Sequence, residues 1–106
     1  MSMFDSVRLS GSEYVQLKCF GCHMTEFALG DAVTLIPRSR IGDDVSWIPA
    51  PATFQVALSD GSFLTVLDGR LRCRDRARRD GLPVVDSYGV PWSGDLSKAG
   101  TVLTHA

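Results

Sequence analysis

The chain has 106 residues, of which 44% are apolar and 22% charged, with 11 lysines and arginines against 12 aspartates and glutamates. This composition is typical of one globular domain, and the length excludes two independently folding ones. No apolar run approaches the roughly 18 residues of a membrane helix. Residues 1–9 lack the features of a secretory signal, and an odd number of cysteines argues against a disulfide framework, so we expect a cytoplasmic protein.

Short apolar runs broken by Gly, Pro, Asp and Ser predict strands rather than helices along the whole chain. Residues 6–9 and 14–18 are expected to pair through the turn at 10–12. A further strand is expected over 32–36, after Gly30-Asp31, and a short one over 45–48. The result would be a mostly-β protein.

The clearest prediction is a three-stranded antiparallel meander over residues 53–74. Asp60-Gly61 and Asp68-Gly69 separate three runs that are rich in β-branched and aromatic residues. An Asp-Gly pair supplies the two positive-φ positions of a type I′ hairpin turn. Two consecutive hairpins with two-residue loops are therefore expected.

These loop lengths also predict the register of the meander. Leu58 would lie opposite Phe63, and Leu67 opposite Arg70. One face of the sheet would then carry Ala57, Leu64, Val66, Leu71 and Cys73.

After the meander, a helical turn is expected over 75–80 and an aromatic loop over 86–94 that folds back over a sheet edge. Residues 96–106 show little pattern and are expected to form a flexible tail, although 101–104 offers a further edge strand. The predicted β-rich domain is therefore 1–95.

Five to seven short strands must close or stack to bury their apolar rows, which predicts a small partly open barrel or a sandwich. The order of Gly30-Asp31-Ala32-Val33 and the later hairpin around Asp60-Gly61 resembles SH3-like and Tudor-like barrels. That resemblance implies an SH3-like fold. It implies no ligand site, because the aromatic cage of methyl-lysine binders is missing.

The segment 19–23 reads Cys-Phe-Gly-Cys-His, and two thiolates at this spacing can bind one metal ion across a tight turn. A structural zinc ion needs two further ligands, and Cys73 is the only other thiol. His23, His105 or a carboxylate would complete the set. The zinc hypothesis therefore uses Cys19, Cys22, Cys73 and His23.

Other interpretations of this segment need different surroundings. It matches the attachment signature of covalently bound haem, but the β-rich pattern does not fit that cofactor. A thioredoxin-like dithiol requires a βαβ pattern that is absent. In the simplest interpretation the cysteines are small buried side chains. We expect either no cofactor or a structural zinc ion.

Residues 70–80 hold six of the eleven basic residues and two acids, so this segment carries +4 while the rest of the chain carries −5. In a strand, alternate residues share a face, so Arg70, Arg72 and Arg74 would form one row. Guanidinium groups in a row suit carboxylates or phosphates. The alternative is a solvated edge strand whose charges prevent edge pairing.

The acids lie singly in turns, and no catalytic motif surrounds the cysteines or histidines, so an enzyme is not expected. We expect a non-enzymatic binding module, such as a regulator or inhibitor, that recognises an acidic protein surface, with nucleic acid as the alternative partner. A zinc-stapled domain is the second hypothesis and a thiol-dependent enzyme the third. The expected contact residues are Arg70, Arg72, Arg74, Arg76, Arg78, Arg79, Tyr88 and Trp92.

Overall fold

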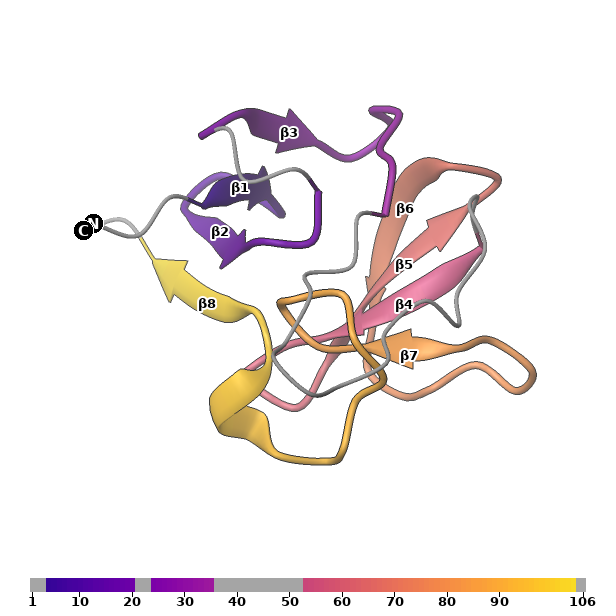
Figure 1. Ribbon diagram of the computed structural model, residues 1–106. Coiled ribbons are helices and arrows are strands. Elements are labelled where there is room, and N and C mark those ends of the chain that lie inside the picture. Colours follow the sequence, from indigo (N-terminus) through magenta and orange to yellow (C-terminus); the bar gives the residue numbers. More distant parts are fainter. Residues whose placement is uncertain (1–3, 21–23, 36–52, 105–106) are drawn as a thin grey trace.

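The computed structural model describes residues 4–20, 24–35 and 53–104 (Figure 1). Within these ranges the protein is mostly β, and two mixed four-stranded sheets pack into an open arrangement rather than a closed barrel. The predicted fold class is confirmed. Among the described residues, no helix has the length and apolar character needed to cross a membrane.

Sheet A has the strand order β3-β1-β2-β8. The predicted N-terminal hairpin is confirmed, because β1 (Asp5–Arg8) and β2 (Glu13–Leu17) pair antiparallel. The short strand β3 (Glu26–Ala28) pairs parallel to β1, and β8 (Thr101–Thr104) pairs antiparallel to β2. Sequence reasoning missed β3, which has only three residues.

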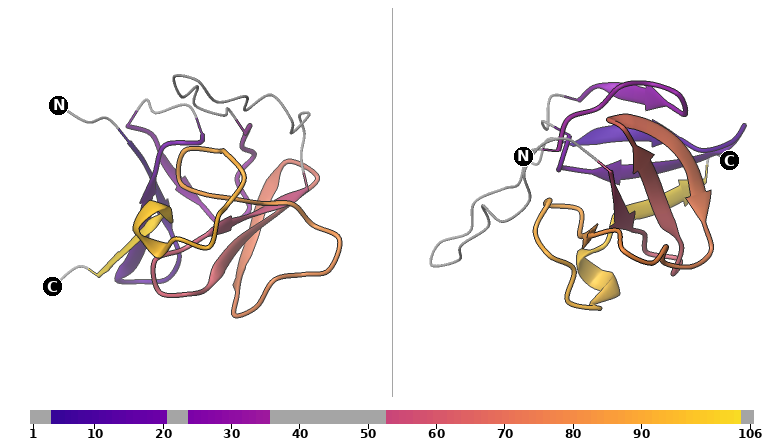
Figure 2. Two further views of the ribbon diagram at one scale, coloured as in Figure 1. Left: turned by 60° about the horizontal axis from the view of Figure 1, so that its bottom comes forward. Right: turned by 90° about the vertical axis from the view of Figure 1, so that its right-hand side faces the viewer.

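Sheet B has the order β6-β5-β4-β7 and contains the predicted meander. It consists of β4 (Phe54–Ala57), β5 (Phe63–Leu67) and β6 (Arg70–Asp75), while β7 (Val84–Val85) adds parallel to β4. Figure 2 shows the segment that leaves β7 in sheet B and reaches β8 in sheet A.

The second turn of the meander is confirmed and the first is not. Asp68 and Gly69 both have positive φ, and Leu67 lies opposite Arg70 as predicted. At the first turn only Gly61 has positive φ, and the Asp60 carboxylate accepts the backbone and hydroxyl hydrogens of Ser62.

This first loop is therefore one residue longer than predicted. The Leu58 N–H donates to the Ser62 carbonyl and the Gly61 N–H to the Leu58 carbonyl, which is the three-residue loop with a bulged glycine. Ala57, not Leu58, lies opposite Phe63. A one-residue slip turns every side chain of β4 to the other face of the sheet.

A β-bulge interrupts the pairing of β5 with β6. Leu71 lies opposite Val66 and Cys73 opposite Thr65, so Arg72 is the extra residue. Cys73 therefore does not share the face of Leu71, which corrects the prediction for Cys73. The one-residue slip also places Ala57 on the other face. Of the five residues predicted to face the core, only Leu64, Val66 and Leu71 do so.

The main core fills the space between the two sheets, where thirteen buried side chains form one apolar cluster. Its largest members include Phe54, Leu58, Leu64 and Leu71 from the meander region and Leu17 from β2. A smaller cluster on the other face of sheet B contains Ala57, Phe63, Val84, Ala99 and Trp92.

Three further predictions, for residues 32–36, 75–80 and 45–48, have different outcomes. Ala32 makes one isolated bridge to Arg70 and residues 33–35 are not a strand, because their partner is the turn at Gly69 rather than a strand edge. Residues 76–80 form bends and a turn instead of the predicted helical turn. The strand expected over 45–48 lies outside the described residues.

Within the segment expected to be a flexible tail, Leu96–Lys98 forms a 3₁₀ helix and 101–104 forms β8, the edge strand that the sequence offered there. Asp95 caps this helix through its side chain, and Val102 packs against the main core. The aromatic loop folds back as predicted, since the Trp92 N–H donates to the Val84 carbonyl.

Gly100 is where β8 meets the core, and we expect Gly100→Ala to destabilise the fold. An added Cβ would lie 3.0 Å from Val15 Cγ1 and 3.2 Å from Leu58 Cδ2. Overpacking of this kind costs about 1–3 kcal/mol. Gly11→Ala is the matched control, because its Cβ would meet nothing within 4 Å. Urea unfolding checks both; equal stability of the two variants would contradict the prediction.

Candidate functional site

The bulge at Arg72 divides the arginine-rich segment. Leu64 belongs to the core face of β5 and lies opposite Arg74, so Arg74 points toward sheet A. Its guanidinium contacts Glu13 of β2 at 2.9 Å and Asp60 at 3.5 Å. The predicted single row of Arg70, Arg72 and Arg74 is therefore wrong, because the extra residue changes the alternation of the strand.

Arg79 is also held within the molecule. Its Nε lies 2.7 Å from Asp75 Oδ2, and its backbone N–H donates to the Gln55 side chain at 2.9 Å. Arg74 and Arg79 thus have their charges compensated by nearby carboxylates. The main role of these two arginines is therefore structural.

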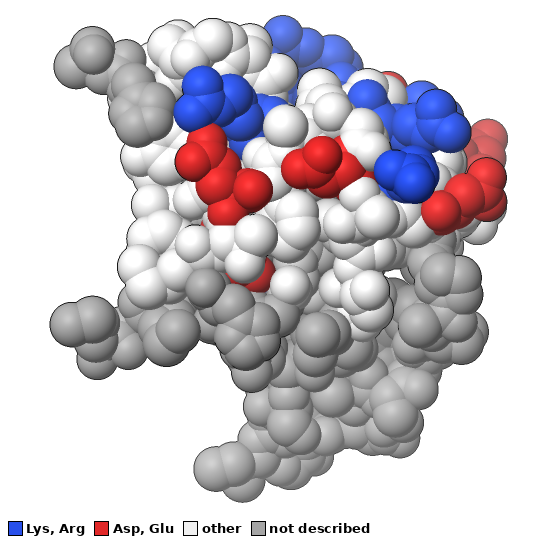
Figure 3. Space-filling model, turned by 90° about the horizontal axis from the view of Figure 1, so that it is seen from above, with Lys and Arg blue, Asp and Glu red and all other residues white. Residues whose placement is uncertain are grey.

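The other arginines of the segment are exposed. The side chains of Arg72, Arg76 and Arg78 form no hydrogen bond or ion pair with any residue that the structure describes, and the Arg70 side chain donates only to the Gly30 carbonyl at 3.1 Å. We call these four residues the arginine surface. Figure 3 shows basic side chains along one side of the molecule with acidic ones beside them, so the charge there is mixed rather than continuous.

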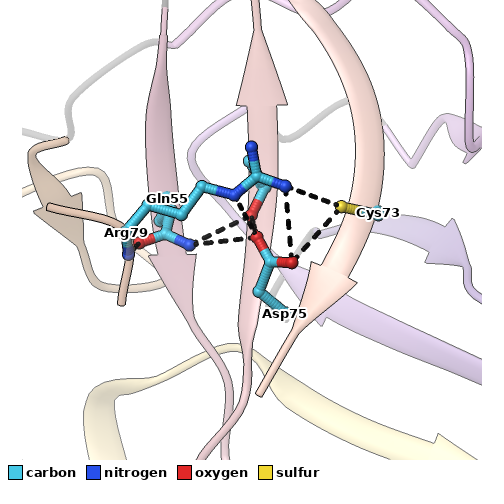
Figure 4. A network of polar contacts seen from close by, with 5 residues as sticks. Gln55, Cys73, Asp75 and Arg79 are labelled. Carbon is cyan, nitrogen blue, oxygen red and sulfur yellow. Dashed lines mark hydrogen bonds and ion pairs between the residues drawn. The ribbon is translucent and has the colours of Figure 1, made fainter. Parts of the chain in front are cut away.

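A polar network lies beside this surface, on the face of sheet B that points away from sheet A (Figure 4). The Gln55 amide donates to Thr65 Oγ1 at 3.0 Å and to Asp75 Oδ2 at 3.4 Å, and Thr65 also donates to Asp75. Gln55 and Thr65 are fully buried. Together with Arg79, these bonds fix the loop that carries Arg76 and Arg78 onto the sheet.

Sequence reasoning missed this network. The available signal was Gln55, a polar residue within the apolar run of β4. A buried amide needs hydrogen-bond partners, and β5 and β6 were expected to be adjacent. The contribution of Arg79 could not be read from the pattern.

The network also sets the protonation of its members. Hydrogen bonds from Arg79 and Thr65 lower the pKa of Asp75. Burial, followed by the negative charge of Asp75, raises the pKa of the Cys73 thiol. Both effects favour the neutral thiol over the thiolate, which is the nucleophilic form.

The two described cysteines, Cys19 and Cys73, do not meet. Cys19 is buried in the core between the sheets, where desolvation raises the pKa of its thiol, while Cys73 lies on the other face of sheet B. One tetrahedral metal site cannot use both. Cys22 and His23 lie outside the described residues, and the described ranges contain no group of three metal-ligating side chains.

The two aromatic residues take separate places. The Trp92 ring packs edge-on against Phe63, 5.6 Å between centroids, and its Nε1 donates to the Asp95 carbonyl. Since Phe63 lies opposite Asp75 on β6, Trp92 shares a sheet face with the polar network. Tyr88 instead lies beside Lys18, at the end of β2.

Comparison of the chain with protein-family models, curated proteins and solved structures finds no match. The class of the protein is therefore the one that its own fold defines, a small β-rich domain.

Asp75→Asn should lower stability in a pH-dependent way. Because the folded-state pKa of Asp75 is depressed, its carboxylate stabilises the fold above the unfolded-state pKa of about 3.9, and this stabilisation is lost as pH falls through the folded-state value. We expect a loss of about 1–3 kcal/mol at pH 7, typical of hydrogen bonds to charged groups.

The difference between wild type and Asp75→Asn should shrink as pH falls below about 4, measured by urea unfolding. Asp80→Asn serves as the control, because Asp80 has no side-chain partner among the described residues. A pH-independent difference would refute the role assigned to the Asp75 charge.

Proposed function

We propose that this chain is a non-enzymatic binding module whose arginine surface contacts an acidic patch on a partner protein. The observation that carries the proposal is the division of the arginines: Arg74 and Arg79 are compensated internally, while Arg72, Arg76 and Arg78 are left exposed without a carboxylate in the described structure. Each of the three guanidinium groups can donate two parallel hydrogen bonds to a carboxylate.

The polar network supports the proposal, because it holds the base of the loop through Arg79. Binding then costs less conformational entropy than it would for a freely moving loop. Attraction between opposite charges also steers the partner toward this side of the molecule, and salt weakens that attraction.

A protein partner fits better than nucleic acid for two reasons. The chain outside residues 70–80 carries −5, which opposes a long polyanion that wraps the domain. Stacking of unpaired bases at the arginine surface requires accessible ring faces beside those arginines. Trp92 packs edge-on against Phe63, and Tyr88 lies with Lys18 at the end of β2.

The raised pKa of both described thiols argues against the thiol-dependent enzyme, and their free state fits the reducing cytoplasm that we propose as the location. A small domain that covers an acidic surface would suit a regulator or inhibitor.

The test is a triple variant, Arg72→Gln with Arg76→Gln and Arg78→Gln. Binding to an oligoglutamate peptide, followed by fluorescence anisotropy at low salt, should weaken by about tenfold or more, since charge-assisted contacts are lost. Wild-type binding should also weaken as salt is added.

The matched control replaces Arg8, Arg38 and Lys98 by Gln, which removes the same net charge from other positions in the sequence. At a salt concentration that screens general charge effects, the affinity of this control for oligoglutamate should stay within about twofold of the wild-type affinity. Equal losses in both triple variants would overturn the arginine surface. Tighter binding of an oligothymidine than of oligoglutamate would overturn the choice of a protein partner.

A further inference from the structure

A groove of about 290 Å³ lies away from the arginine surface, where β2 ends and β8 begins. Two backbone hydrogen bonds build it: the Lys18 N–H donates to the Ser87 carbonyl at 2.7 Å, and the Ser87 N–H donates to the Lys98 carbonyl at 2.9 Å. Ser87 thereby joins the end of β2 to the segment that leads into β8. The groove is thus formed by three chain segments fixed to one another.

Three polar residues of the groove have side-chain groups with no hydrogen bond or ion pair to any described residue. The Lys18 ammonium lies 5.4 Å from the centroid of the Tyr88 ring and has no ion pair within the described ranges. Gln16 and Thr101 face each other across the β2–β8 pair, and neither side chain makes a hydrogen bond to a described residue. A cation, an amide and a hydroxyl are therefore available together.

The rest of the lining is partly apolar. Phe4 and Tyr88 are the aromatic residues of the lining, and the Tyr88 ring lies beside the Lys18 ammonium. Pockets that bind small molecules combine such walls with a few polar groups that fix orientation. The groove beside β1 differs, because its Arg8 is neutralised by Glu26 at 2.7 Å.

We propose that this groove binds a carboxylate attached to a small apolar group, which is a site separate from the arginine surface. Lys18 compensates the single negative charge, Gln16 and Thr101 donate to the carboxylate oxygens, and the apolar group lies against Phe4 and Tyr88. A single cation in the lining favours a carboxylate over a doubly charged phosphate. Free carboxylic acids and peptide C-termini share this chemistry.

The test titrates isotopically labelled full-length protein with benzoate and follows the backbone amide signals by NMR. Saturable shifts are expected at Lys18, Ser87 and Thr101. Benzamide lacks the charge and acetate lacks the apolar group, so each should bind about tenfold more weakly or worse. A peptide with a C-terminal phenylalanine, compared with its amide, distinguishes a peptide terminus from a free acid.

Lys18→Met should abolish saturation by benzoate, and Lys18→Gln provides a second variant if the first one fails to fold. Lys98→Met is the matched control, because it removes one positive charge from a residue outside the lining, and its titration should follow wild type. Unchanged benzoate binding in a folded Lys18 variant, equal binding of benzamide, or shifts confined to other surfaces would each overturn the proposal. None of these results bears on the arginine surface.

Discussion

The bulge at Arg72 decides which side chains of β6 enter the space between the sheets and which face away from it. With regular alternation, Cys73 would follow Leu71 into the core and Arg74 would point outward. The extra residue reverses both, so Arg74 reaches Glu13 on the other sheet and Cys73 joins the polar network with Thr65 and Asp75. The ion pair between Arg74 and Glu13, which links the two sheets at this edge, therefore depends on one inserted residue.

The internal carboxylates then sort the arginines by role. Glu13, Asp60 and Asp75 compensate Arg74 and Arg79, which are partly shielded from water or tied to buried groups. Ion pairs of exposed side chains contribute little to stability, but those anchored to a buried amide such as Gln55 also fix geometry. Because Arg79 is fixed in this way, the charges of Arg76 and Arg78 are presented from a defined loop.

The segment that follows β7 forms part of the groove where β2 ends and β8 begins. It must cross from sheet B to sheet A to deliver β8, and on the way it packs Trp92 and Ala99 over sheet B and ties Ser87 to Lys18. The same crossing lines a groove in which the Lys18 ammonium has no ion pair with any described residue. One connection thus closes an apolar face and opens a polar site, at a distance in the fold from the arginine surface.

The sequence by itself determined the β class, the N-terminal hairpin, the meander and the Asp68-Gly69 turn, because alternation and positive φ are local properties. It also determined the density of arginines. Only the tertiary structure decided the parallel strands β3 and β7, which are too short to show a pattern, and the bulge at Arg72, which periodicity does not reveal. The pairing of Arg74 with Glu13, 61 residues away in the chain, likewise depends on how the sheets pack. The sequence determined how many charged side chains the protein has. Packing between distant segments decided which of them remain exposed.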